Sequence, residues 1–140
     1  MKINALVLVL AAAMAGCSTP PPANAPGSDG RSPDQLALIV VESDQVKLDE
    51  LDGKPQPGSG TSNFYVPPGA HRFQLRLNWC PGGLCTVYGA YADKPRTACV
   101  DAKAGMRYRF TAANPGPDWA ARVTEQQGNG DPKTIDARCT

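Results

Sequence analysis

The sequence predicts an all-β domain between residues 35 and 140, an antiparallel sandwich or barrel of about seven short strands. In residues 70–79, AHRFQLRLNW, apolar and polar side chains alternate, as in a strand with one face on a core and one face in water. The same alternation recurs over residues 106–112 and 119–124. No window from 35 to 140 has a convincing helical period of 3.6 residues, and Gly, Pro and Asp separate the apolar runs.

Residues 35–43, QLALIVVES, are apolar on both faces, which is typical of a buried central strand. The expected strands in chain order are 35–43, 62–66, 70–79, 85–91, 97–102, 106–112 and 119–124. Turn signals stand at Asp52-Gly53, Pro67-Pro68-Gly69, Asp93-Lys94-Pro95 and over residues 128–132, GNGDP. The side chains expected to face the core in the alternating strands are His71, Phe73, Leu75, Leu77, Trp79, Met106, Tyr108, Phe110, Ala112, Trp119, Ala121 and Val123.

The start of the chain is predicted to be a secretory leader. Lys2 and an apolar run over residues 5–15 have its pattern, and the run is roughly half the length that a membrane-spanning helix needs. Met14-Ala15-Gly16-Cys17 resembles the lipobox of bacterial lipoproteins. That resemblance implies cleavage before Cys17 and acylation of this cysteine, so that the chain is anchored to a membrane through lipid. An ordinary signal peptide with a chance cysteine is the alternative.

A spacer is expected between the anchor and the domain. Residues 18–34 contain five prolines and no large apolar side chain, which predicts a disordered tether with a reach of roughly 50 Å. The expected organisation is a signal peptide over 1–16, the lipidated cysteine and tether over 17–34, and the β domain over 35–140. Ser18 in place of aspartate favours, by the lipoprotein resemblance, the outer membrane of a bacterial envelope, with the domain facing the periplasm.

The charge balance gives no reason to expect a nucleic-acid partner. Without Lys2, the 14 Lys and Arg side chains fall to 13, which equals the 13 Asp and Glu side chains. An exported chain without net positive charge has no strong attraction to nucleic acid. The expected partners are the membrane, through Cys17, and an envelope protein or an anionic glycan.

Four further cysteines predict two disulfides, for which three connectivities exist. One pairing joins Cys80 to Cys85 within CPGGLC and Cys99 to Cys139 near the C-terminus. Its main rival joins Cys85 to Cys99 and Cys80 to Cys139. Because the C-x-x-C spacings of zinc and redox sites are absent, no metal site and no cofactor are expected.

No catalytic residue is expected either. His71 is the only histidine, and it lies in phase with Phe73 and Leu75, which favours a packed or turn-bonding role. The acidic side chains of Asp49, Glu50 and Asp52 could imitate a paired-carboxylate site or a calcium loop, but the EF-hand pattern is not met and a solvated turn is the simpler interpretation. A shallow enzymatic site built on Asp49, Asp52 or His71 remains as a third hypothesis.

A basic binding face is a more informative candidate site than any of these catalytic residues. Its four arginines are expected on outward faces of neighbouring or near-neighbouring strands, where they would attract anionic envelope polymers or an acidic protein surface. The alternative is two ordinary soluble faces whose arginines are paired with nearby acids. The four residues are Arg72, Arg76, Arg107 and Arg109.

A series of four segments resembles a known domain type. LDGKPQ, YVPPGAHRFQLRL, VDAKAGMRYRFTA and WAARVTE, in this order, are similar to the PEGA-type, transthyretin-like β-sandwiches of small bacterial envelope proteins. The resemblance covers roughly residues 36–126 and consists mostly of turn chemistry, so it implies a sandwich fold more than a function. The long loop at 54–62 and the CPGGLC insertion depart from the pattern.

Together these features predict an envelope lipoprotein whose β-sandwich is a non-enzymatic binding or structural module in the periplasm. The second hypothesis is an inhibitor-type or secretion-apparatus lipoprotein that presents the CPGGLC loop, made rigid by a disulfide, to one protein partner.

Overall fold

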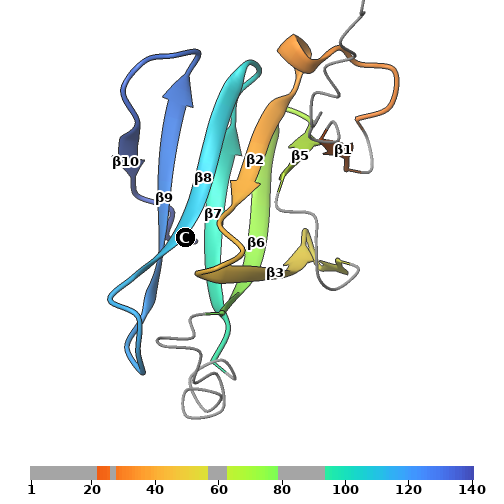
Figure 1. Cartoon of the computed structure of the whole chain (residues 1–140). Helices are drawn as coiled ribbons and strands as arrows, with labels where there is room; N and C mark the ends of the chain where they lie inside the picture. Colours follow the sequence, from red (N-terminus) through yellow and green to blue (C-terminus); the bar gives the residue numbers. More distant parts are fainter. Residues whose placement is uncertain (1–21, 26–27, 57–62, 79–93) are drawn as a thin grey trace, which may run out of the picture.

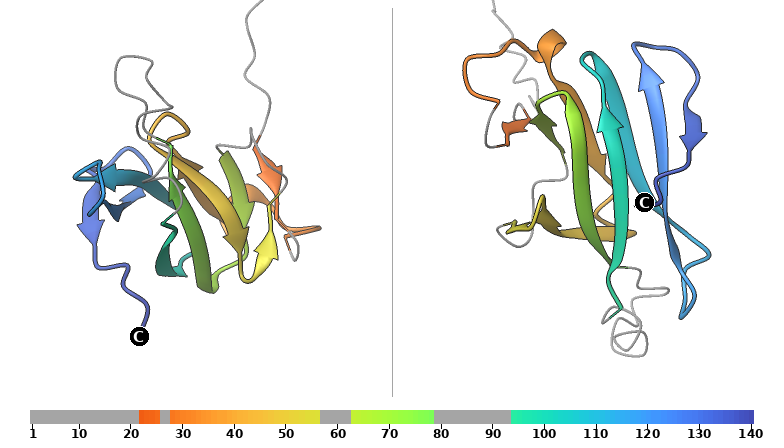
Figure 2. Two further views of the ribbon diagram at one scale, coloured as in Figure 1. Left: turned by 90° about the horizontal axis from the view of Figure 1, so that it is seen from below. Right: turned by 180° about the vertical axis from the view of Figure 1, so that it is seen from behind.

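Two β-sheets packed face to face form the domain in the computed structural model, which describes residues 22–25, 28–56, 63–78 and 94–140 (Figure 1). The sandwich prediction is confirmed, and the alternative of a closed barrel is wrong. In Figure 1 the strands β2 (Ala37–Val41) and β8 (Met106–Ala113) lie in front of β6 (Gly69–Leu77) and β7 (Arg96–Ala102), and in the reverse view of Figure 2 they lie behind them.

The two sheets differ in size. The six-stranded sheet has the order β1 (Ala23–Asn24), β5 (Asn63–Val66), β2, β8, β9 (Ala120–Gln127) and β10 (Lys133–Ile135). The four-stranded sheet has the order β4 (Lys54–Pro55), β3 (Val46–Leu51), β6 and β7. Of these ten strands three have two or three residues, which leaves seven longer strands in the described part of the chain, close to the expected number. Pairing is antiparallel except for β1 with β5 and β2 with β8, which are parallel.

The core lies between the sheets and is built by the predicted alternation. Phe73 and Leu75 of β6 are fully buried, as are Tyr108 and Phe110 of β8, and the rings of Phe73 and Phe110 meet across the two sheets at 4.5 Å between centroids. Trp119 precedes β9 and is 1% exposed, with its indole N–H donating to the Lys94 carbonyl oxygen at 3.3 Å. Period-two patterning was therefore a reliable guide to which faces are buried.

Among the described residues, Tyr108 is the one buried core residue with an ionisable side chain. Its hydroxyl accepts a hydrogen bond from the Lys103 backbone N–H at 3.1 Å. Burial raises the pKa of the Tyr108 phenol, more than the Lys103 hydrogen bond lowers it. The hydroxyl therefore stays neutral in the core, where it also lies 3.4 Å from the Asp101 carbonyl oxygen as a donor.

The segment 35–43 forms the expected central strand. Strand β2 lies between β5 and β8, with Ala37, Ile39 and Val41 buried against the core. Its alternate residues, Leu38 and Val40, lie on the outer face and are half-buried. Side chains on both faces of this strand are therefore at least partly shielded from water, which agrees with its apolar sequence.

The expected tether differs most from the structure. Within its described residues, Ala23 and Asn24 form β1 on the edge of β5, and the Ala25 N–H donates to the Tyr65 carbonyl oxygen at 2.8 Å. Ser28 is fully buried, and its hydroxyl donates to the same Tyr65 oxygen at 3.3 Å. The folded domain therefore begins before residue 35. A segment of small residues can add to a sheet edge through its backbone alone, which composition does not reveal.

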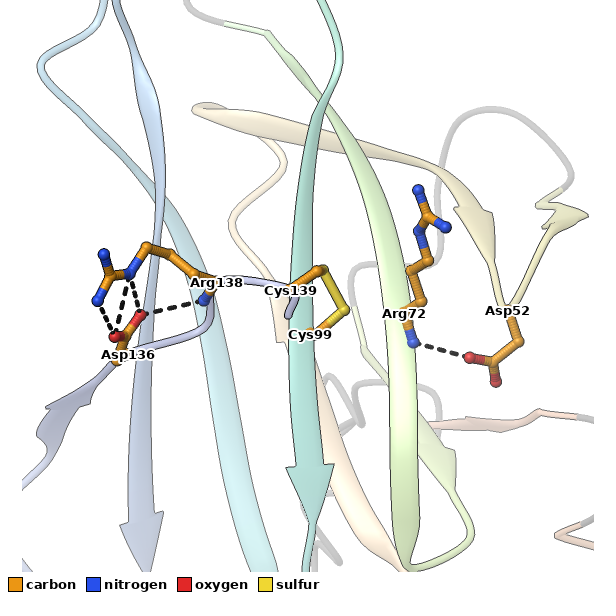
Figure 3. Close-up of a disulfide and its surroundings, with 6 residues drawn as sticks. All are labelled: Asp52, Arg72, Cys99, Asp136, Arg138 and Cys139. Atoms are coloured by element: carbon orange, nitrogen blue, oxygen red, sulfur yellow. Dashed lines mark hydrogen bonds and ion pairs between the residues drawn. A yellow bond between two sulfur atoms is a disulfide. The ribbon is translucent and has the colours of Figure 1, made fainter.

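The C-terminal segment crosses from one sheet to the other. After β10, the Ala137 carbonyl oxygen accepts a hydrogen bond from the Cys99 N–H of β7 at 2.8 Å, and Cys99 forms a disulfide with Cys139 (Figure 3). This confirms the Cys99–Cys139 pairing and excludes the rival connectivity. Beside it, hydrogen bonds and charge from Arg138 lower the pKa of the exposed Asp136 carboxyl to about 2.

Some predictions fall outside the described residues: Trp79, the strand expected over 85–91, and Cys80 and Cys85 with the CPGGLC loop. Within the described ranges, no helix is both long and apolar enough to cross a membrane.

Candidate anion-binding groove

The four predicted arginines do not form one face. Arg72 and Arg76 belong to β6 in the four-stranded sheet, whereas Arg107 and Arg109 belong to β8 in the six-stranded sheet. All four are exposed, so they lie on the two opposite outer surfaces of the sandwich. The single basic patch is therefore a wrong prediction, because alternation shows that a side chain points outward but not to which sheet its strand belongs.

The arginines of β6 share their outer face with acidic side chains, and one of the two is ion-paired. The Arg76 Nε donates to Asp49 Oδ2 at 2.9 Å, and Asp49 lies in the bulge of β3 between Leu48 and Glu50. Glu50 itself lies opposite Gln74, on the same ladder. This outer face therefore has the mixed, locally paired charge that the sequence left open as the alternative.

The arginines of β8 are joined by a third arginine from β9. In the β8–β9 ladder Arg107 lies opposite Gln126, Arg109 opposite Thr124, and Thr111 opposite Arg122. These six side chains and Pro132 line a groove of about 500 Å³ on the outer face of the six-stranded sheet, which we call the arginine groove. The site is thus built mainly from the outward-pointing side chains of one pair of strands, β8 and β9.

The groove is positively charged. None of its lining residues is acidic. Arg109 forms an ion pair with Glu42, just beyond β2, at 3.1 Å, and its side chain is 50% exposed. Among the described residues, Arg107 and Arg122 have no acidic partner within ion-pair distance. Two guanidinium groups are thus available to an anion, and the third is only partly neutralised.

A turn closes one end of the groove. Residues 128–132 connect β9 to β10, as the sequence predicted, and Gly128 adopts a positive φ of 53° there. The Gln126 amide nitrogen donates to the Gly130 carbonyl oxygen at 2.7 Å. This bond orients the Gln126 side chain and leaves its amide oxygen as an acceptor.

Sequence reasoning missed Arg122 as a member of the site. The alternation of Trp119, Ala121 and Val123 already places Arg122 and Thr124 outward, and this was the available signal. The missing information was the β8–β9 register, which places Arg122 opposite Thr111 and so brings it onto the same outer face as Arg107 and Arg109.

His71 has the turn-bonding role that its position favoured. Its Nδ1 lies 2.7 Å from Asp52 Oδ2, its Nε2 lies 2.7 Å from the Pro67 carbonyl oxygen, and its side chain is 10% exposed. In a catalytic triad one of these nitrogens would be free to take a proton from a nucleophile. Here both nitrogens are engaged by acceptors of the fold.

The acidic cluster does not converge on one point. Asp49 pairs with Arg76, while Asp52 bonds His71 and the Arg72 N–H. Within the part of the chain that the structure describes, no three His, Cys, Asp or Glu side chains gather as metal ligands.

Comparison with known proteins adds no family to this description. No protein-family model, no curated protein and no solved structure matches this chain. The fold and the groove define a β-sandwich with one basic outer face, and the function is inferred from that face.

Proposed function

We propose that this protein is a lipid-anchored lipoprotein of the bacterial cell envelope whose β-sandwich is a non-enzymatic binding module, with the arginine groove as its binding surface for an anionic partner. The observation that carries the proposal is the groove itself. It gathers Arg107 and Arg109 of β8 and Arg122 of β9 on one outer face without an acidic lining residue. Guanidinium groups are permanently charged and bind carboxylate or phosphate oxygens in a bidentate manner.

Two further observations favour this proposal. The Cys99–Cys139 disulfide suits an oxidising compartment such as the periplasm, where such bonds persist. The lipobox-like Met14-Ala15-Gly16-Cys17 supplies the anchor, and we place the protein at the outer membrane on the identity of Ser18.

A binding role also fits the chemistry of the polar side chains. Arginine does not exchange protons near neutral pH, so the groove can hold an anion but offers no general base. His71, the only histidine, uses both ring nitrogens to join Asp52 and Pro67 within the fold.

The first test compares two double variants in intact cells. Arg107→Gln with Arg122→Gln removes the two groove charges that have no acidic partner among the described residues. Arg72→Gln with Arg76→Gln removes as many charges from the opposite face. Cross-linking followed by mass spectrometry and glycan analysis measures what co-purifies. We expect the groove variant to recover at least tenfold less partner, because each lost charged hydrogen bond costs about 1.5–3 kcal/mol.

The opposite-face variant is the control and should recover the partner at the wild-type level. Equal losses in both variants would show that only net charge matters and would contradict the proposal. Circular dichroism and thermal unfolding of both variants check that the fold is retained. In the same cells, Cys17→Ser should release the protein from the membrane fraction.

A further inference from the structure

We propose, resting on the function above, that the arginine groove binds a linear acidic glycan, a polysaccharide chain carrying carboxylate or sulfate groups, laid along the direction of β8 and β9. The inference follows from how charge and neutral polar groups alternate along the groove.

The groove has three levels of the same composition. Each level is one cross-strand pair that combines one arginine with one neutral hydrogen-bonding side chain: Arg107 with Gln126, Arg109 with Thr124, and Arg122 with Thr111. Alternate residues of a strand are about 6.8 Å apart, so the three levels extend over about 14 Å. The arginines lie on β8 at the first two levels and on β9 at the third, so positive charge runs obliquely along the groove.

This arrangement suits an elongated ligand better than a compact anion. A single phosphate or carboxylate is held best where several donors converge on one point, as in a nest of backbone N–H groups or a cluster of arginines. Here the guanidinium groups start from successive levels of the ladder. A chain with several anionic groups can engage all three levels at once, whereas a monoanion engages one.

The neutral lining favours a glycan over an acidic protein. Thr111, Thr124 and Gln126 offer hydroxyl and amide groups, which both donate to and accept from sugar hydroxyls. Gln126 is held by its bond to Gly130, so its free amide oxygen has a defined position. Protein partners bind mainly through aromatic or apolar anchors in pockets, and Pro132 is the only apolar lining residue.

The experiment is an isothermal titration calorimetry series in which the full chain is titrated with galacturonic-acid oligomers of one to six sugars, at low and at physiological salt. Neutral maltohexaose is the uncharged control. We expect affinity to rise with oligomer length until the groove is spanned and then to level off. The affinity of the hexamer should fall with salt with a log–log slope of no more than about three, one for each arginine engaged.

Variants at the two ends of the groove test the linear arrangement. Arg107→Gln and Arg122→Gln lie at opposite ends, and each should weaken hexamer binding by about tenfold, the loss expected for one charged hydrogen bond. Each should leave binding of the monomer within about threefold, because the monomer can still use another level. Arg72→Gln on the opposite face should change neither.

The failures of the two proposals are distinguishable. If the monomer binds as tightly as the hexamer, or if only one end variant weakens the hexamer, the linear-glycan inference is overturned. If no oligomer binds while the groove variant still loses an acidic protein in the cellular cross-linking, the glycan inference is overturned and the binding module stands. If groove variants change neither readout, the proposed function itself fails.

Discussion

At the residue scale, Asp52 joins a turn, a strand and the only histidine. It adopts a φ of 52° and precedes Gly53 at 75°, a pair of positive values that a tight two-residue hairpin turn requires. Its Oδ1 accepts from the Arg72 N–H at 2.8 Å (Figure 3). Its Oδ2 lies 2.7 Å from His71 Nδ1. The turn between β3 and β4 is thereby tied to β6.

We expect Asp52→Ala to lower the free energy of unfolding by about 2 kcal/mol, for two reasons. The substitution leaves the Arg72 N–H without its acceptor, and it places alanine, whose side chain cannot form local hydrogen bonds, at a positive φ. Asp52→Asn should cost less, because asparagine tolerates this conformation and can still accept from Arg72. Urea unfolding measures both changes.

Asp131→Ala is the matched control for Asp52. Asp131 is an exposed aspartate of the β9–β10 turn, and its removal should change the free energy of unfolding by less than about 0.5 kcal/mol. Equal effects of Asp52→Ala and Asp131→Ala would show that the hydrogen bonds of Asp52 contribute little.

The sequence predicted part of this arrangement of Asp52 and His71. The Asp52-Gly53 turn and the packed position of His71 follow from local pattern, because turn chemistry and strand phase act over a few residues. The contact between them joins residues 19 apart in the chain and depends on how β3 and β6 pair. No short-range signal in the sequence carries that pairing.

At the element scale, β1 covers the edge of β5. An exposed edge strand presents unpaired backbone groups, and the N-terminal segment satisfies the Tyr65 carbonyl oxygen through Ala25 and Ser28. Small side chains permit this close approach: Ala25 is 8% exposed and Ser28 is fully buried. The segment behaves as part of the sheet although its composition is that of a linker.

We expect Ala25→Asp to detach this segment, because it places a carboxylate in a buried position without a partner. Limited proteolysis should then cut within residues 22–34, while hydrogen exchange in β6 to β9 stays slow. Ala23→Asp is the matched control, since Ala23 is exposed, and should leave proteolysis unchanged. Unchanged cleavage in Ala25→Asp would mean that β1 contributes nothing to holding the segment.

The positions of the strands along the chain were easier to predict than which strands pair with one another. Strands β7, β8 and β9 match their predicted ranges within a few residues, because alternation and turns define them, whereas the short β10 was not predicted. The parallel pairings of β1 with β5 and of β2 with β8 had no local signature. For the same reason the sequence did not show that the four predicted arginines lie on two sheets or that Arg122 belongs with Arg107 and Arg109: two of the four line the arginine groove, and two lie on the opposite face.

At the scale of the whole molecule, the Cys99–Cys139 disulfide links the two sheets. Cys99 lies on β7 of the four-stranded sheet, and Cys139 follows β10 of the six-stranded sheet. The bond closes a loop with a sequence separation of 40 residues that contains β8, β9 and the arginine groove.

We expect the double variant Cys99→Ala with Cys139→Ala to lose up to about 4 kcal/mol of unfolding free energy, the loop-entropy value for a ring of this size. Under reducing conditions the variant and the wild type should unfold at the same urea concentration, which controls for effects of the substitutions themselves. Binding at the groove should persist where the variant is folded. An unchanged midpoint would contradict a stabilising role of the bond.

The pairing of β1 with β5 also limits the distance between the domain and the membrane to which Cys17 would anchor it. With Cys17 lipidated as proposed, six peptide units separate the lipid from Ala23, and they span at most about 20 Å, compared with roughly 50 Å for a tether that ended at residue 34. Effective concentration falls roughly as the −3/2 power of tether length, so a tether of six peptide units in place of 17 raises the effective concentration of a ligand near the bilayer about fivefold. We therefore expect the domain to stay close to its membrane and to meet polymers of that region more often than polymers farther away in the envelope.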